Sequence, residues 1–351
     1  MKKPKVLFME LLDNNYGNRR YDLEMIRIMK EIVTVTVAYP EGWFESLPQD
    51  VEKISYKNIE LSKTKNSKLN NYLLHYRILK IAQKIDRENQ FDYIFFSSYH
   101  SYCMCLSRVM FKNLSRIFVV NHNNIDFVDK SLKSKIIYKL YCTKINHIVY
   151  EAFIGEHLVN EYSVPKDNIF VLPHPMNRVV DEEKKYDCVG ISNSNDDAWI
   201  KEIIDYESQT SILKENNKKF ILRSKSEEFD DGGLKVFKGY LTDEQYYSYI
   251  SSAKIIFLPF ELSFKYRMSG SVIDAFSGKT KVVGSKIPLF EAYEKEYSAI
   301  CRTIERPTEL VDIIVSQEYK DNQSCKDFDA FALKHSDAQI IQVLKKMFGL
   351  R

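Results

Sequence analysis

Apolar and polar positions in the first half of the chain follow two different patterns. Short apolar runs such as Val6–Met9 have the length of buried strands, whereas Tyr21–Lys30 repeats its apolar residues at helical spacing. Another helical pattern carries Leu69, Tyr72, Leu73, Tyr76 and Leu79. The remaining runs predict strands at Val33–Ala38, Tyr93–Phe96, Ile117–Val120, Ile148–Tyr150 and Ile169–Leu172, and helices near Leu132–Tyr141 and Phe153–Glu161. This alternation is typical of a parallel sheet covered by helices on both faces.

The alternation stops at a polar, charged stretch, Asn177–Lys185, and then restarts. Thr242 and Gln245 have capping-box spacing and predict the start of a helix that runs to Ser252. Strands are predicted in this half at Cys188–Ile191, Phe220–Leu222, Val236–Phe237, Ile255–Leu258 and Lys281–Val283. We therefore expect an α/β protein of two doubly wound parallel-sheet domains, 1–176 and 177–330, that face each other across a cleft. A C-terminal helix in 331–351 is expected to pack back toward the first domain. Ligands bind such sheets beyond the carboxyl ends of the strands.

The composition argues against several classes of protein but does not by itself identify a function. The chain has 351 residues, with 51 Lys and Arg against 48 Asp and Glu, so its formal net charge of +3 gives no general argument for nucleic acid. No apolar run approaches the length of about 18 residues that spans a bilayer. The apolar run after Lys2, Lys3 and Lys5 contains Glu10 and leads to no cleavage site, so a buried strand explains it better than a signal peptide does. The six cysteines are scattered and have no zinc-site spacing, which favours buried free thiols in a cytoplasmic protein without a bound metal.

The clearest candidate site follows the predicted strand Ile255–Leu258. Ser269, Gly270 and Ser271 stand where the next helix begins, and free amides at a helix N-terminus favour a phosphate. Asp274 lies one turn into that helix, within reach of a ribose diol. Lys265 and Arg267 precede the turn and can neutralise a diphosphate. The alternative is an ordinary capped helix preceded by solvated basic residues.

This segment, Leu258-Pro-Phe through Arg267-Met-Ser-Gly-Ser-Val-Ile-Asp-Ala to Gly278-Lys-Thr-Lys-Val-Val, resembles the donor site of GT-B glycosyltransferases. Within them it is most similar to the large retaining family that builds bacterial capsule and O-antigen polysaccharides. The stretches Val164 to Pro175 and Val236 to Pro259 agree with that family in order and spacing. The resemblance covers most of the chain. It implies a nucleotide diphosphate sugar as co-substrate and no other cofactor.

The resemblance carries over residue by residue. It implies that Asp274 binds the nucleotide ribose and that the turn at Ser269, Gly270 and Ser271 binds the diphosphate. The glutamate that contacts the transferred sugar in that family falls here on Tyr266, and Glu261 is the nearest upstream carboxylate that can replace it.

A second departure concerns the basic pair that supports the diphosphate. Ile191 to Asn193 follows the first strand of the second domain where the family has an arginine, so Arg223 and Lys225 after the next strand are the candidates for this charge. Simple surface charge is the alternative. Tyr240 stands where the family packs the nucleobase, and a core or rim aromatic is the other interpretation.

The first domain offers fewer candidates. The polar turn from Asp13 to Arg20 lacks a GxGxxG pattern, which argues against a dinucleotide site, but Gly17 allows close approach and Arg19 or Arg20 can meet phosphate. A solvated turn is the alternative. The resemblance implies that His122 touches the donor sugar, and a histidine there can also act as a general base. His100 is the weaker candidate.

Lysines interleave with apolar residues between Lys130 and Lys144. This pattern fits either a solvated helix that covers the sheet or a basic amphipathic element on anionic lipid. The second would suit an enzyme whose acceptor is a lipid-linked glycan.

We therefore expect a retaining glycosyltransferase of the hexosyltransferase type, acting in the cytoplasm or at the inner face of the plasma membrane. It would take its sugar to a glycan or lipid-linked glycan acceptor. A nucleotide-sugar epimerase would need a cluster of carboxylates or histidines that the sequence does not show. A non-catalytic GT-B-like scaffold remains the alternative because Tyr266 replaces the expected glutamate.

Overall fold

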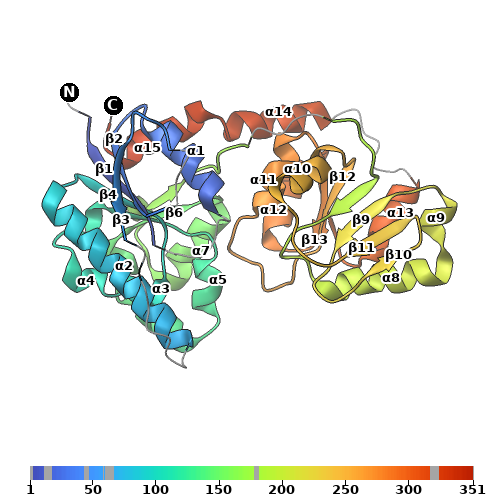
Figure 1. Cartoon of the computed structure of the whole chain (residues 1–351), viewed down its shortest axis with the longest axis horizontal. Coiled ribbons are helices and arrows are strands. Elements are labelled where there is room, and N and C mark those ends of the chain that lie inside the picture. Colours follow the sequence, from blue (N-terminus) through green and yellow to red (C-terminus); the bar gives the residue numbers. More distant parts are fainter. Residues whose placement is uncertain are drawn as a thin grey trace. The chain divides into compact units, whose positions relative to one another are not determined.

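The computed structural model describes residues 3–11, 18–42, 47–57, 59, 67–177, 182–316 and 324–350 (Figure 1). The chain divides into two compact units. The first contains Met1–Pro175 together with Ser336–Arg351, and the second contains Met176–His335.

The first unit is built on a seven-stranded sheet in which each recorded strand pair is parallel. The first strand lies in the middle of the sheet, and the chain moves outward on one side before it crosses to the other. The strands in spatial order are β3 (Glu52–Tyr56), β2 (Thr34–Pro40), β1 (Lys5–Glu10), β4 (Tyr93–Ser98), β5 (Ile117–Val120), β6 (Asn146–Val149) and β7 (Ile169–Val171). The direction of winding therefore switches between β1 and β4, and the carboxyl ends of the strands meet at this edge.

The helices between these strands include several short ones. They are α1 (Arg19–Met29), α2 (Ser67–Asn89), α3 (Ser101–Met104), α4 (Ser107–Met110), α5 (Asn124–Asp129), α6 (Leu132–Lys139) and α7 (Ala152–Tyr162). Two of the short ones, α3 and α4, follow one another between β4 and β5.

The last helix of the chain, α15 (Asp337–Met347), belongs to the first unit and packs against α1 and β7 (Figure 1). The Arg27 guanidinium donates to both carboxylate oxygens of Asp337, at 2.7 and 2.9 Å. The C-terminal helix expected in 331–351 corresponds to α15, which begins at Asp337. The Ser336 side chain caps a new helix by accepting from the Gln339 amide, so α14 (Ser324–Lys334) ends in the second unit before α15 begins.

Six strands of the second unit repeat the order of the first six strands of the first sheet, while β10 is added at one edge and no described strand corresponds to β7 at the other. Its strands in spatial order are β10 (Phe229–Asp230), β11 (Leu234–Phe237), β9 (Phe220–Arg223), β8 (Cys188–Gly190), β12 (Ile255–Leu258), β13 (Lys281–Ser285) and β14 (Cys301–Ile304). Only the added β10 pairs antiparallel among the described strands. The predicted α/β class with two doubly wound sheets is confirmed.

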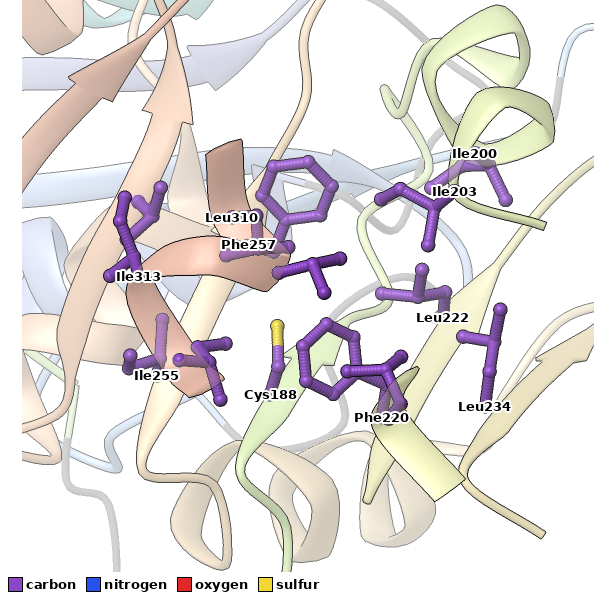
Figure 2. Packing of buried hydrophobic residues seen from close by; sticks show 14 of the residues in the cluster. Cys188, Ile200, Ile203, Phe220, Leu222, Leu234, Ile255, Phe257, Leu310 and Ile313 are labelled. Atoms are coloured by element: carbon purple, nitrogen blue, oxygen red, sulfur yellow. The ribbon is translucent and has the colours of Figure 1, made fainter. Parts of the chain in front are cut away.

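Helices cover both faces of the second sheet (Figure 1). They are α8 (Asp197–Thr210), α9 (Ile212–Glu215), α10 (Asp243–Ser251), α11 (Gly270–Ser277), α12 (Pro288–Glu296), α13 (Thr308–Ser316) and α14. Figure 2 shows the core under α8 and α13, where Ile200 and Leu310 meet strand residues such as Phe220 and Phe257. The predicted capping box is confirmed, since Thr242 and Gln245 exchange hydrogen bonds at the start of α10.

The described residues include no helix that is long and apolar enough to cross a membrane. The expectation that the cysteines are buried holds for Cys103, Cys142, Cys188 and Cys301. It is wrong for Cys325, which is exposed at the start of α14, and for the partly exposed Cys105.

Candidate functional site

The loop between β12 and α11 brings the predicted phosphate-binding turn to the carboxyl end of the second sheet. Ser269 has an extended backbone at the N-cap position of α11, but its side chain makes no capping hydrogen bond to the first turn. A side chain added at Gly270 would meet no protein atom within 4 Å. This helix end is therefore open for a ligand to approach the backbone, and its dipole favours an anion.

Asp274 lies on α11 and is only 5% exposed. One carboxylate oxygen accepts from the Asn177 amide at 2.6 Å, and the other accepts from the Tyr246 hydroxyl at 3.1 Å. Tyr246 also lies 3.1 Å from the Ser271 hydroxyl, so it links Asp274 to the turn. These two hydrogen bonds fix the orientation of the Asp274 carboxylate, a group with about four acceptor positions.

Arg223 ends β9 and is buried beneath the exposed ring of Tyr240. Its Nε donates to the Gly239 carbonyl at 2.5 Å, and its guanidinium carbon lies 5.0 Å from the Tyr240 ring centroid. Gly239 has a φ of 100°, a conformation that favours glycine. Tyr240 itself is 86% exposed, which excludes the core interpretation. A ring held from below by a cation and open to solvent on its other side is a stacking platform.

The other predicted cations are less firmly held. Lys225 is exposed after β9, with its ammonium 3.5 Å from the Asn195 carbonyl. Lys265 is also exposed, while the guanidinium carbon of Arg267 lies 4.1 Å from the Phe264 ring centroid. Positive charge thus gathers at the carboxyl ends of β9 and β12, two strands that flank β8.

The carboxylate proposed to replace the missing glutamate is not drawn into this group. Glu261 is exposed in the turn after β12, where it accepts from the Ser263 hydroxyl at 3.1 Å. Tyr266 is partly buried in the same loop.

In the first unit, His122 follows β5 and its ring turns into the protein. Its Nε2–H donates to the Ser97 carbonyl at 2.8 Å, which leaves Nδ1 to accept from the Tyr150 hydroxyl at 3.0 Å. Its ring packs edge to face on Tyr21, with 5.2 Å between centroids. Burial, aided by the nearby His174, lowers the pKa of His122 to about 3. Both ring nitrogens are therefore engaged within the protein, and such a low pKa makes the imidazole a weak proton acceptor, so this geometry does not favour His122 as a general base.

Gly17, Arg19, Arg20 and His100 are the remaining candidates of the first unit. Gly17 lies outside the described residues. Arg19 and Arg20 are the first residues of α1. The ring of His100 stacks on His75 at a centroid distance of 4.9 Å, and burial lowers its pKa to about 4, so it has a packing role.

The structure thus joins the predicted residues in two groups, Asp274 with Ser271 and Arg223 with Tyr240. Sequence reasoning missed Asn177 and Tyr246, the two residues that hold the Asp274 carboxylate. The position of Tyr246 in the first turn of the capped helix α10 was the signal that could have found it.

No protein-family model matches the chain, and the search of curated proteins finds no match. Solved structures match along its full length. Sucrose-phosphate synthase from Thermosynechococcus elongatus has a TM-score of 0.69 at 12% identity, covering 99% of this chain and 98% of its own. HepE from Anabaena, solved with UDP-glucose, has a TM-score of 0.64 at 10% identity, covering 99% of this chain and 100% of its own. UGT89C1 from Arabidopsis thaliana, solved with quercetin, has a TM-score of 0.61 at 11% identity, with 99% and 100% covered.

At such identities these similarities establish the fold. The two sheets, each of seven strands with flanking helices, match a two-domain Rossmann-like architecture. The chain therefore has the GT-B fold.

Proposed function

We propose that this protein is a glycosyltransferase that takes a hexosyl group from a nucleotide diphosphate sugar. The observation that carries the proposal is the set of groups that lie at the carboxyl ends of the strands in the second sheet. It combines an open helix N-terminus at Gly270, a cation-backed exposed ring at Tyr240 and a positioned carboxylate at Asp274. These three features suit a diphosphate, a base and a ribose, respectively. Two proteins with a similar fold, HepE and LpCGTa, were solved with UDP or UDP-glucose, which agrees with this choice of donor class.

In the proposed reaction an acceptor hydroxyl attacks the anomeric carbon on the face that the diphosphate leaves. The carbon–oxygen bond to the diphosphate breaks, and the departing phosphate oxygen takes the hydroxyl proton, so the configuration is retained. Arg223, Lys225, Lys265 and Arg267 supply positive charge for the leaving group, together with the amides at the start of α11. No side chain needs to act as a base, which agrees with the low pKa, and hence the weak basicity, of His122.

We further propose that the reaction needs no metal and serves bacterial surface polysaccharide synthesis, with a glycan or lipid-linked glycan as acceptor at the cytoplasmic side of the membrane. Arg223 and the open turn can perform the charge neutralisation that a metal would otherwise supply. A turnover rate that is unchanged by a chelator would support the proposal that the reaction needs no metal.

The test is a thermal-shift screen with UDP-, GDP-, dTDP- and CMP-sugars, followed by calorimetry and a transfer assay with the selected donor. We expect one nucleotide class to raise the melting temperature. Asp274→Ala should abolish both binding and transfer. Tyr246→Phe is the matched control, because it removes one hydrogen bond to Asp274 and keeps the carboxylate, so binding should weaken only a few-fold. If no nucleotide sugar shifts the melting temperature, the donor-site proposal is wrong. Donor binding without any transfer, with Asp274→Ala leaving pathway output in cells unchanged, would favour the non-catalytic scaffold.

A further inference from the structure

Exposed large apolar side chains are concentrated on one part of the first unit. Of the thirteen among the described residues, nine lie on or beside α2, α3, α4, α5 and α6. Soluble monomers usually expose such residues singly. We call this set the apolar helical face, and it consists of Leu69, Tyr72, Leu73, Leu106, Val109, Phe127, Leu132, Ile136 and Leu140.

These residues belong to elements that are packed together. Helix α6 packs against α3 and α5, and α2 packs against α3 and α4. Tyr102 of α3 connects α2 with α5, since its ring centroid lies 5.8 Å from that of Tyr72 and 5.7 Å from that of Phe127. Its hydroxyl lies 2.7 Å from that of Ser134 on α6. The helices that carry the apolar helical face therefore form one packed group.

Helix α6 turns its apolar side outward. The side chains that it buries include Ser134 and Tyr138, whereas Leu132 is 74% exposed. Ile136 and Leu140 follow Leu132 at intervals of four residues and are also exposed. A helix that simply covered the sheet would bury this stripe. The first interpretation of the lysine-rich stretch, a solvated covering helix, therefore does not explain its apolar residues.

The charge around this face is strongly one-sided. Residues 93–150 contain eight Lys or Arg and only two acidic residues, Asp126 and Asp129. Asp126 is buried, and Asp129 is occupied by His157, Tyr162 and Lys135. The exposed charges of this segment are cations, carried by Arg108, Lys112, Lys130, Lys133, Lys139 and Lys144.

We propose that the apolar helical face is the surface by which this protein docks on an anionic lipid bilayer. Its apolar side chains would enter the headgroup region while the surrounding lysines meet lipid phosphates. A second copy of the chain is a poorer occupant, because pairing two such faces would bring like charges together. The inference names a partner for the proposed glycosyltransferase and rests on that function only for its biological purpose.

The test uses sedimentation of the full chain with vesicles of phosphatidylglycerol and phosphatidylcholine in equal parts. Vesicles of phosphatidylcholine alone serve as the comparison, each at low and high salt. We expect binding to the anionic vesicles that weakens with salt. Lys130→Glu/Lys133→Glu should lower the partition coefficient by about thirtyfold or more. Leu132→Ser/Ile136→Ser should lower it at least about tenfold.

Matched controls come from exposed residues of the second unit. Lys295→Glu/Lys326→Glu makes the same charge change, and Leu333→Ser makes a similar apolar change. Both should leave vesicle binding unchanged. A cooperative thermal unfolding transition, measured on each variant, verifies folding. Binding of the nucleotide that the thermal-shift screen selects separates the two proposals, since a folded variant of this face should keep it.

The proposal is overturned if the protein does not sediment with anionic vesicles, or if the face variants and the controls behave alike. It is also overturned if the protein is a dimer that Leu132→Ser/Ile136→Ser converts to a monomer, because a second copy would then cover the face.

Discussion

The two sheets have the same core strand order, but their carboxyl edges differ in chemistry. In the first unit, His122 is enclosed by Ser97, Tyr150 and Tyr21, and neighbouring His174 is also buried. In the second unit, the corresponding edge carries an exposed Tyr240 and an open Gly270. Topology therefore brings polar residues to the same place in both units. Whether these polar residues form a ligand site depends on how many of their hydrogen-bonding groups are already paired with neighbouring side chains.

The largest expected difference between the units is in acid stability. Burial lowers the pKa of His122 to about 3 and those of His147 and His174 to about 4, and all three lie in the first unit. Unfolded histidines take up protons below about pH 6.5, so the stability that these residues contribute is full above that pH and is lost as the pH falls toward 4. At pH 4.5 the loss is about 2 kcal/mol per imidazole.

Hydrogen exchange, corrected for its intrinsic pH dependence, measures this loss unit by unit. Between pH 6.5 and 4.5, peptides from β5 and β6 should lose more protection than peptides from β12 and β13. His174→Gln should remove part of the pH dependence. Equal losses in both units would contradict the proposed contrast.

The next effect concerns nucleotide binding. Arg223→Ala removes the cation beneath Tyr240 and should weaken the binding of UDP by about a hundredfold, as expected for a lost charge-assisted hydrogen bond. The UDP affinity of Arg223→Lys should lie between those of the wild type and Arg223→Ala, because lysine keeps the charge without the planar guanidinium. Isothermal titration calorimetry measures the dissociation constant of UDP for the wild type and both Arg223 variants. His122→Gln should leave the dissociation constant of UDP unchanged, and a loss equal to that of Arg223→Ala would show that the first unit's edge is not closed to the nucleotide.

The smallest effect tests the open turn. Gly270→Ala places a methyl group where no protein atom lies within 4 Å, so the free protein should be stabilised by about 0.5–1 kcal/mol through a better helix former. Affinity for UDP should nevertheless fall about tenfold if the diphosphate lies against this backbone. Thermal unfolding and calorimetry on the same sample separate the two effects. Unchanged UDP binding by Gly270→Ala would place the phosphate elsewhere.

Strongly apolar segments were predicted well, and half-exposed ones were not. The strand Ile255–Leu258 occurs as predicted because it is fully buried. By contrast, β3 at Glu52–Tyr56 was missed, since it lies at the edge of its sheet and alternates polar residues that water can reach. The break between α14 and α15 was missed as well, because Ser336 becomes a cap only where the chain passes to the other unit.

The sequence alone determined the alternating elements, the two-unit organisation, the capped start of α10 and the turn at Gly270, because each depends on residues that are close in the chain. Only the tertiary structure decided the state of the side chains. His122 is neutral because Ser97 and Tyr150 reach it from other strand ends, and Asp274 is held by Asn177 and Tyr246 from distant segments. Likewise, helical spacing revealed the apolar stripe of α6, but its outward direction follows from the partners that Ser134 and Tyr138 find in Tyr102 and His147. Periodicity is local, whereas burial and hydrogen bonding depend on which segments meet in space.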